Sequence, residues 1–186
     1  MSKYKVLTQN TYSENEFKIV PLRYNDRIKI MNWRNEQIYH LRQDKPLTEE
    51  SQDRYFNKEI LKLFKEDSPK QILFSLLKND ICIGYGGLVH INWKDRNAEI
   101  SFIMNTDHQK KYFKFYWIQF LMLIQKVAFE NLNLHKIYTY AFDLRPKLYE
   151  ALDEAGFIED SRLTDHCCHN KKFIDVVIHY KLNKLC

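Results

Sequence analysis

The sequence predicts one mixed α/β domain, with a mostly antiparallel central sheet flanked by helices. Three observations support this prediction. The chain has 186 residues, which is enough for a single domain with a substantial core. Strand and helix patterns follow one another in the order strand, two helices, three strands, helix, strand, helix, two strands. Only four glycines and four prolines occur, so no low-complexity linker is expected.

The first elements follow a polar N-terminal segment, residues 1–16, which we expect to precede a domain over 17–186. "FKIVPLRY" predicts the first strand, and Asn25 or Asp26 can cap the helix after it. Thr48 can cap a second helix, "EESQDRYFNKEILKLFKE", whose apolar residues recur at helical spacing.

The next three strands form two hairpins. Asn79-Asp80 predicts a tight turn, and "NWKDRN" predicts a looser one. The strands are expected near 70–78, 81–91 and 98–105 because these segments are rich in apolar and aromatic residues.

The remaining elements begin with a long helix over about 112–132, and "HKIYTYAF" predicts the fifth strand after it. Pro146 begins a short helix that Gly156 ends as a C-terminal cap. Two last strands, near 157–167 and 172–182, form a hairpin around "HNKK".

Composition and charge exclude several classes of protein. No apolar run approaches the roughly 20 residues of a membrane span, and the polar start is not a secretory signal. We therefore expect a cytoplasmic protein with no membrane partner. The net charge is +5 without a dense Lys/Arg tract, so no nucleic-acid partner is expected.

The cysteines, Cys82, Cys167, Cys168 and Cys186, have no spacing typical of a disulfide framework. "HCCH", residues 166–169, has the composition of a metal site. Neighbouring side chains on a strand point to opposite faces, so these four cannot easily converge on one ion. We predict no metal.

The element order and four stretches of sequence resemble the GNAT superfamily of N-acetyltransferases. The branch is the one that contains ribosomal-protein N-terminal acetyltransferases and amino-sugar acetyltransferases. The stretches are "IVPLRYNDRIKIMNWRN", "CIGYGGLVHI…NAEISFIMN", "VAFENLNLHKIYTYAFD" and "LYEALDEAGF". The resemblance implies a sheet splayed between the fourth and fifth strands, acetyl-CoA as donor and a small-molecule amine as acceptor. The high aromatic content also favours a homodimer.

The resemblance implies that pantetheine lies in the splay. It would pair with backbone groups of Phe102, Ile103 and Met104, because a splayed strand offers amide and carbonyl groups that lack partners. Asp143 follows the fifth strand, where the family commonly has a polar residue near pantetheine.

The donor pyrophosphate would meet the N-terminus of the long helix, where N–H groups and the helix dipole favour an anion. The family pattern there is Q/R-x-x-G-x-G/A, but this stretch has no glycine. In one register Gln109 takes the first position, and Tyr112 and Lys114 replace the small residues. In the other, which leaves the following helix ungapped, Phe113 and Phe115 replace the glycines. A helix start that binds nothing is the alternative. The cations expected to meet phosphate are Lys110, Lys111 and Lys114.

Two positions carry the expected chemistry. Tyr149 matches the acid that the family places beside the sulfur of CoA. If "NWKDRN" closes its hairpin symmetrically, residues whose numbers sum to about 189 face each other, which pairs His90 with Glu99. The family often has a Glu near this place, and such a pair can accept an amine proton. A cross-strand salt bridge on a solvated face is the alternative.

The acceptor site, by the same resemblance, lies on the two N-terminal helices and their loop. Arginine binds diphosphate by bidentate hydrogen bonds, and aromatic rings stack on bases and sugars. We therefore expect a nucleotide-linked amino sugar, as in polysaccharide biosynthesis. A protein N-terminus, or a non-catalytic binding module with a closed donor site, are the alternatives. The residues expected to bind the acceptor are Trp33, Arg34, Tyr39, His40 and Arg42.

Overall fold

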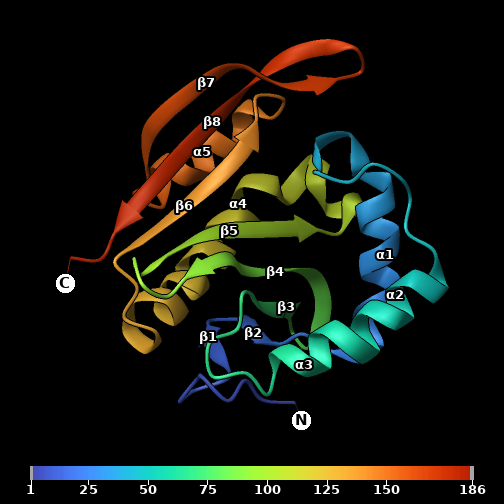
Figure 1. The fold of residues 1–186 in the computed structure, drawn as a ribbon, viewed down its shortest axis with the longest axis vertical. Helices are drawn as coiled ribbons and strands as arrows, with labels where there is room; N and C mark the ends of the chain where they lie inside the picture. Colours follow the sequence, from blue (N-terminus) through green and yellow to red (C-terminus); the bar gives the residue numbers. More distant parts are fainter. Residues whose placement is uncertain (1, 185–186) are drawn as a thin grey trace.

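The computed structural model describes residues 2–184 and shows one eight-stranded sheet with helices around it (Figure 1). The spatial order of the strands is β1-β2-β3-β4-β5-β6-β8-β7. The strands are β1 (Tyr12–Glu14), β2 (Phe17–Pro21), β3 (Ile72–Lys78), β4 (Ile81–Asn92), β5 (Asn97–Met104), β6 (Lys136–Phe142), β7 (Ile158–His169) and β8 (Lys172–Leu182). Every neighbouring pair is antiparallel except β5 and β6, which run parallel.

The helices occupy the connections that the sequence predicts. The α-helices are α1 (Arg27–Glu36), α2 (Glu49–Tyr55), α3 (Leu61–Leu63), α4 (Thr106–Gln125) and α5 (Pro146–Glu154). The shorter helical turns are η1 (Tyr24–Asp26), η2 (Ile38–His40), η3 (Phe56–Ile60) and η4 (Lys126–Asn131). Thr48 caps α2 as expected, in a reciprocal capping box with Ser51. No helix among residues 2–184 combines the length and apolar composition needed to cross a membrane.

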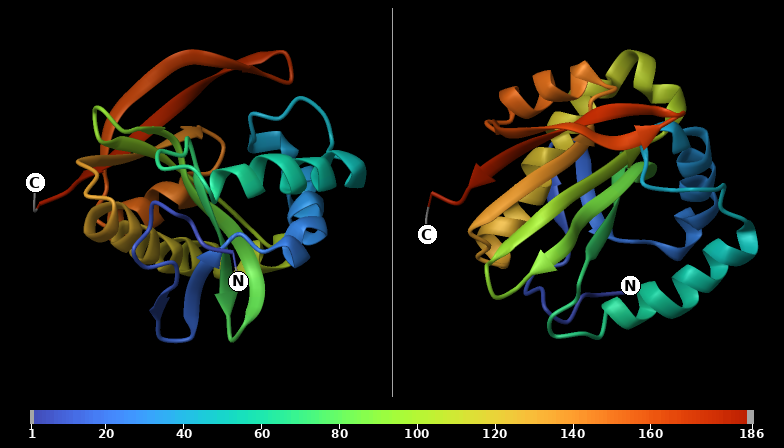
Figure 2. Two further views of the ribbon diagram at one scale, coloured as in Figure 1. Left: turned by 60° about the horizontal axis from the view of Figure 1, so that its bottom comes forward. Right: turned by 45° about the horizontal axis from the view of Figure 1, so that its top comes forward.

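The sheet separates two groups of helices. In Figure 1, α4 and α5 lie behind the strands, whereas α1 and α2 lie beyond the ends of β4 and β5; Figure 2 shows the same arrangement from two other directions. Phe102 of β5 stacks on Phe120 of α4 at 4.2 Å between ring centroids. Trp117, Leu121 and Ile124 of α4 and Ala128 of η4 are all buried in the core.

The N-terminal segment is part of this domain rather than a polar extension of it. The Tyr4 side chain is buried, and its hydroxyl donates to the Leu73 carbonyl at 3.0 Å. β1 adds an edge strand to β2, an element that the sequence analysis did not predict. Cys186 lies outside the described residues.

The long helix begins at Thr106, six residues earlier than predicted. Asn105 is its cap, and the Asn105 side chain accepts the Asp107 N–H at 3.0 Å. The expected phosphate loop, including Gln109 and Phe115, therefore lies in the first three turns of α4.

β5 and β6 diverge as the family resemblance implies. They pair only where residues 97–99 meet residues 136–138. β5 continues to Met104 and β6 to Phe142, so the C-terminal halves of the two parallel strands separate into an open V. Figure 1 shows this separation between the two strands.

Candidate active site

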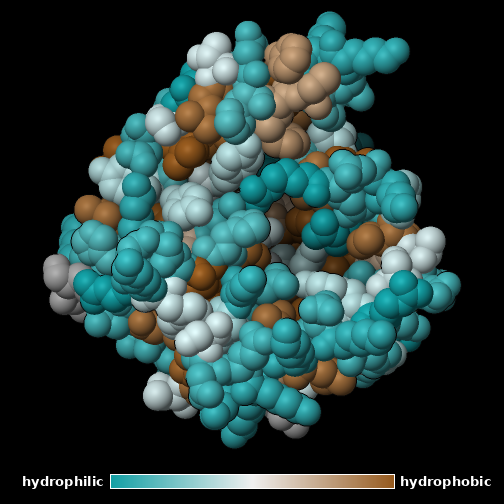
Figure 3. Space-filling model, viewed as in Figure 1, coloured by the Kyte–Doolittle hydropathy of each residue, from teal (hydrophilic) through white to brown (hydrophobic). Residues whose placement is uncertain are grey.

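A cavity of about 800 Å³ extends into the opening between β5 and β6. Its walls come from β4, β5 and β6, from Trp117 of α4, and from the chain between Arg34 and Arg42. Figure 3 shows a hollow near the middle of this face, ringed mainly by hydrophilic residues. The splay, which leaves strand edges without partners, thus borders an accessible cavity.

Glu99 is the acidic group of this cavity. Its side chain is buried, with 5% of the residue exposed, and it forms an ion pair with Arg42. Burial raises the pKa of Glu99, while Arg42 and His90 oppose the rise. A carboxylate in this setting has a greater proton affinity than an exposed one, which suits a general base.

His90 approaches Glu99 by a route that differs from the predicted one. The ladder register pairs Glu99 with Val89, one residue away from the expected partner. A bulge follows Val89, and His90 has a left-handed backbone with φ of 50°. With this bulge the imidazole Nε2 still lies 3.9 Å from the Glu99 carboxylate. The predicted register was wrong by one residue, and the pair nonetheless forms.

Basic side chains outnumber the single carboxylate in the cavity lining. Arg42 is the partner of Glu99, and its guanidinium also lies 4.7 Å from the Tyr140 ring centroid. Arg34 has neutral partners: it donates to the Tyr85 hydroxyl at 2.6 Å and to the Gln43 side chain at 2.9 Å. The basic lining residues are Arg34, Arg42, Lys70 and Arg145. The cavity is therefore electropositive.

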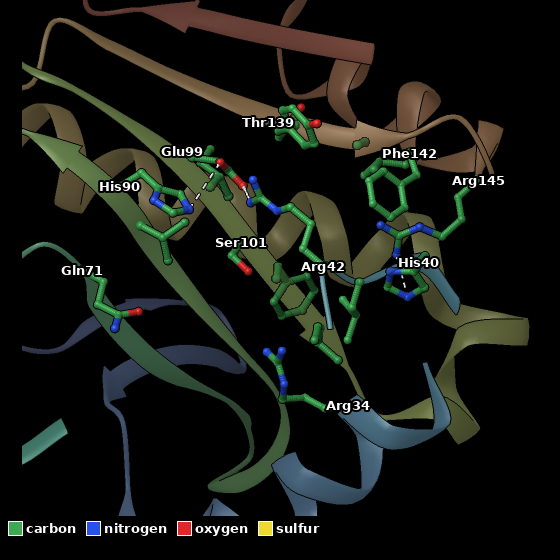
Figure 4. A pocket seen from close by; sticks show the side chains of 18 of the residues that line it. Arg34, His40, Arg42, Gln71, His90, Glu99, Ser101, Thr139, Phe142 and Arg145 are labelled. Atoms are coloured by element: carbon green, nitrogen blue, oxygen red, sulfur yellow. Dashed lines mark hydrogen bonds and ion pairs between the residues drawn. The ribbon is translucent and has the colours of Figure 1, made fainter. Parts of the chain in front are cut away.

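Arg145 and His40 meet at the other end of the cavity from Glu99 (Figure 4). Arg145 Nη1 lies 3.3 Å from His40 Nε2. Burial, helped by the neighbouring Arg145, lowers the pKa of His40 to about 3, so its imidazole is neutral at pH 7.

The predicted acceptor residues separate into two groups. Arg34, His40 and Arg42 line the cavity, as the resemblance implied for this part of the chain. Trp33 is packed in the hydrophobic core, and Tyr39 is an exposed residue whose ring contacts the His40 ring edge-on. Neither Trp33 nor Tyr39 lines the cavity.

Of the three β5 residues predicted to bind the acetyl donor, two line the cavity and one does not. Phe102 and Ile103 line the cavity. Met104 is in the core, and its carbonyl accepts a hydrogen bond from the Gln37 side chain at 2.9 Å.

The predicted phosphate residues on α4 do not line the cavity. The Gln109 amide donates to Gln37, and Lys114 forms an ion pair with Glu154 of α5 at 3.0 Å. The Phe115 ring packs edge-on against Phe17 of β2. Lys110 and Lys111 are exposed on the helix, and Phe113 is half-buried beside Trp117.

The first turn of α4 already has an acidic neighbour. The Thr106 hydroxyl donates to the Glu36 carboxylate at the end of α1. A carboxylate at a helix N-terminus is stabilised by the N–H groups and the dipole, so Glu36 competes with any phosphate for this position.

Tyr149 and Asp143 interact with each other outside the cavity lining. The Tyr149 hydroxyl donates to Asp143 Oδ1 at 2.8 Å, and Arg162 forms an ion pair with the same carboxylate. Burial and the Asp143 carboxylate raise the pKa of the phenol. In this arrangement the structure does not bring the expected acid to the cavity.

Several polar residues of the cavity were missed by the sequence analysis, among them Thr139 and Ser101. Thr139 lies on β6 at the point where the strand leaves β5, and its buried hydroxyl has no hydrogen-bond partner within residues 2–184. Ser101 faces the same space from β5. A serine or threonine within a strand of alternating apolar residues carries no distinctive sequence signal, so neither residue could be identified from the sequence.

The cysteine-rich stretch lies on β7 and does not line the cavity, although Cys167 Sγ lies 3.5 Å from the hydroxyl of Tyr140, which does. Cys167 is paired with Ile174 and Cys168 with Phe173 of β8, and successive side chains alternate between the two faces. Within residues 2–184, no three His, Cys, Asp or Glu side chains gather as a metal site.

Comparison with known proteins gives consistent results. Residues 19–178 match a family model described as an acetyltransferase (GNAT) domain. Spermidine N(1)-acetyltransferase of Vibrio cholerae serotype O1 is 34% identical over 103 residues, which cover 54% of this chain and 56% of that protein. The match thus spans about half the length of the curated relative.

Solved structures resemble the whole fold. The spermidine N-acetyltransferase of Vibrio cholerae in complex with CoA and spermine superposes with a TM-score of 0.77 at 24% identity, covering 91% of this chain and 97% of that one. A dodecameric structure of the Vibrio cholerae enzyme in an intermediate state gives a TM-score of 0.72 at 25% identity, covering 91% and 95%.

Proposed function

Because this chain belongs to the GNAT acetyltransferase family, we propose that it transfers an acetyl group from acetyl-CoA to the primary amine of a small-molecule acceptor. The observation that carries this proposal is the cavity in the β5–β6 splay, with the buried Glu99 inside it. The splay offers strand edges to a peptide-like pantetheine, and the carboxylate offers a base to the amine.

The reaction requires a neutral amine, a polarised thioester carbonyl and a proton for the departing thiolate. Glu99 accepts the amine proton, directly or through His90. A backbone N–H of β5, in the part of the strand that β6 leaves unpaired, donates to the carbonyl oxygen as negative charge develops there. The C–N bond forms and the C–S bond breaks, and the thiolate takes a proton. Tyr149 serves as this acid only if its hydroxyl leaves Asp143 and turns toward the cavity.

The favoured acceptor is an amine that also carries negative charge, such as a nucleotide-linked amino sugar. Four basic residues line the cavity against the one carboxylate of Glu99, which Arg42 already neutralises. Arg34 is supported only by neutral groups, so it remains available to an anionic partner. A peptide N-terminus without such a negative charge would form fewer favourable electrostatic interactions with this site.

A polyamine is the second candidate, since the Vibrio cholerae relatives are named for spermidine. A polycation entering this cavity would meet like charges, which cost free energy in a partly desolvated site. A non-catalytic module with a closed donor site is the third, supported by the glycine-free start of α4 and by Glu36 at that position.

The test is an acetyl-transfer assay with a panel of amines. Thiol release from acetyl-CoA is followed together with mass spectrometry of the product, with spermidine, a UDP-linked sugar bearing a primary amine, and a short peptide as acceptors. We expect turnover with the sugar nucleotide. The absence of transfer to every amine, together with no thermal stabilisation by millimolar acetyl-CoA, would refute the enzyme proposal in favour of the non-catalytic module.

Self-association accompanies this proposal. One relative is described as dodecameric, and the β7–β8 hairpin exposes large apolar side chains, including Ile158 and Phe173. Such residues are typical of protein interfaces. Light scattering of the purified protein should give a mass above that of the monomer, as the homodimer expected from the sequence requires.

A further inference from the structure

The cavity contains a cation without an acidic partner at its open end. Arg145 is the residue before α5, three residues after the end of β6, and its side chain is half-buried. Within residues 2–184, it forms no ion pair with a carboxylate; its contacts are His40 and the ring of Phe113, whose centroid lies 5.9 Å from the guanidinium carbon. Burial lowers the pKa of Arg145 to about 10, which leaves the group charged at pH 7. A desolvated positive charge of this kind is stabilised by an incoming anion.

His40 adds a second buried polar group to the same place. The Nε2 of the neutral imidazole lies 3.3 Å from Arg145 Nη1 and 3.4 Å from Gln37 Oε1. His40 is 7% exposed, and its Nδ1 reaches no partner within residues 2–184 other than the backbone of His40 itself. A buried ring nitrogen without a partner costs free energy until a ligand forms a hydrogen bond with it.

Phe113 explains why the guanidinium is held here. It is one of the two aromatic residues that replace the expected glycines, and it lies in the second turn of α4. A ring close to a guanidinium favours the charged form and restricts its position. The aromatic replacement therefore supports a side-chain cation at the place where the main chain of α4 is no longer available.

The position along the parallel strands indicates the ligand. β5 and β6 are joined near Glu99 and are separated where Arg145 follows β6. Figure 4 shows Glu99 and His90 at one end of the cavity and Arg145 and His40 at the other. A long thioester that enters the V with its acetyl group near Glu99 leaves its phosphorylated end near Arg145.

We propose that Arg145 and His40, supported by Phe113, form a side-chain site for a diphosphate, and that this diphosphate belongs to acetyl-CoA. The inference rests on the proposed function for the identity of the donor. A diphosphate on a nucleotide-linked acceptor offers the same chemistry, so the experiment must separate the two sources.

The experiment measures ligand affinity by isothermal titration calorimetry and by melting temperature. The ligands are acetyl-CoA, S-acetyl-pantetheine, which lacks the diphosphate, and UDP. The variants are Arg145→Gln, Arg145→Lys and His40→Gln, and the control is Arg54→Gln, which removes an exposed arginine paired with Glu50 away from the cavity. Circular dichroism and melting without ligand establish that each variant is folded.

We expect Arg145→Gln to weaken the binding of acetyl-CoA on the order of ten- to a hundredfold and to leave the affinity for S-acetyl-pantetheine unchanged. Arg145→Lys should retain part of the acetyl-CoA affinity that Arg145→Gln loses. His40→Gln should reduce the acetyl-CoA affinity less than Arg145→Gln does. Unchanged acetyl-CoA affinity in folded Arg145→Gln and His40→Gln would overturn the site. If these variants lost affinity for UDP but kept their affinity for acetyl-CoA, the assignment of the diphosphate to the donor would be overturned. If the unmodified protein bound no acetyl-CoA, the proposed function itself would fail.

Discussion

The His90 imidazole lies 3.9 Å from the Glu99 carboxylate, although Val89 and not His90 is the residue opposite Glu99 in the ladder. The bulge after Val89 is what brings the two side chains together. The proposed base and its proposed proton relay are thus positioned by a local backbone irregularity, a common device at active sites.

Replacing Glu99 by Gln should abolish most of the acetyl transfer. The amide keeps the size of the side chain but cannot accept the amine proton, and general bases contribute about 10²- to 10⁴-fold. Steady-state kcat/KM measures the effect, with Glu59→Gln on the exposed surface of η3 as the control. Activity within about threefold of the original would remove Glu99 from the chemistry.

Replacing Tyr149 by Phe should have a small effect, below about fivefold in kcat. The hydroxyl is bonded to Asp143 and the pKa of the phenol is raised, so the group is poorly placed to give a proton to the thiolate. Single-turnover kinetics would check this. A hundredfold slower chemical step in a folded variant would instead establish the acid role that the family resemblance implies.

Stability should fall as the pH is lowered from about 6.5 toward 3. The pKa of His40 is about 3 in the folded protein against 6.5 ordinarily, so the unfolded chain binds a proton in this window that the folded chain does not. The contribution is fully present above pH 6.5. Urea unfolding at several pH values should show a shallower dependence for His40→Gln, while the lowered pKa of His179 keeps a remainder of the same sign. An identical dependence in both proteins would contradict the neutral assignment.

Replacing Arg34 by Gln should distinguish acceptors by charge. Arg34 has only neutral partners, so the loss of its charge should raise KM for an anionic amine by about tenfold and leave spermidine unaffected or improved. Initial rates against both acceptors measure the change. Equal increases in KM for the two would indicate that Arg34 acts by packing alone.

The sequence predicted most of the fold because apolar periodicity and turn residues are local signals. The hairpin turn at Asn79-Asp80 and the Thr48 cap appear where these signals place them, whereas the separation of β5 from β6 was expected only from the family resemblance. The early start of α4 had a signal that was overlooked, since Asn105 followed two residues later by Asp107 is a typical helix start.

The site was less predictable because its geometry depends on distant segments. The register error at Glu99 arose from a bulge, and a positive φ at His90 is not evident from residue type. From the sequence, Arg145 at a helix start could equally contact a phosphate or be surface charge; in the structure it contacts His40 and Phe113, which come from two other parts of the chain. Only tertiary packing brings these three together.

The most direct test of the central claim is a competition between two acceptors for limiting acetyl-CoA. Equal concentrations of spermidine and a UDP-linked sugar bearing a primary amine are mixed with the protein, and both products are quantified by mass spectrometry. The electropositive cavity predicts that the acetylated sugar nucleotide exceeds acetylspermidine by more than about tenfold, the effect of roughly 1.4 kcal/mol. Acetylspermidine as the main product would contradict the account.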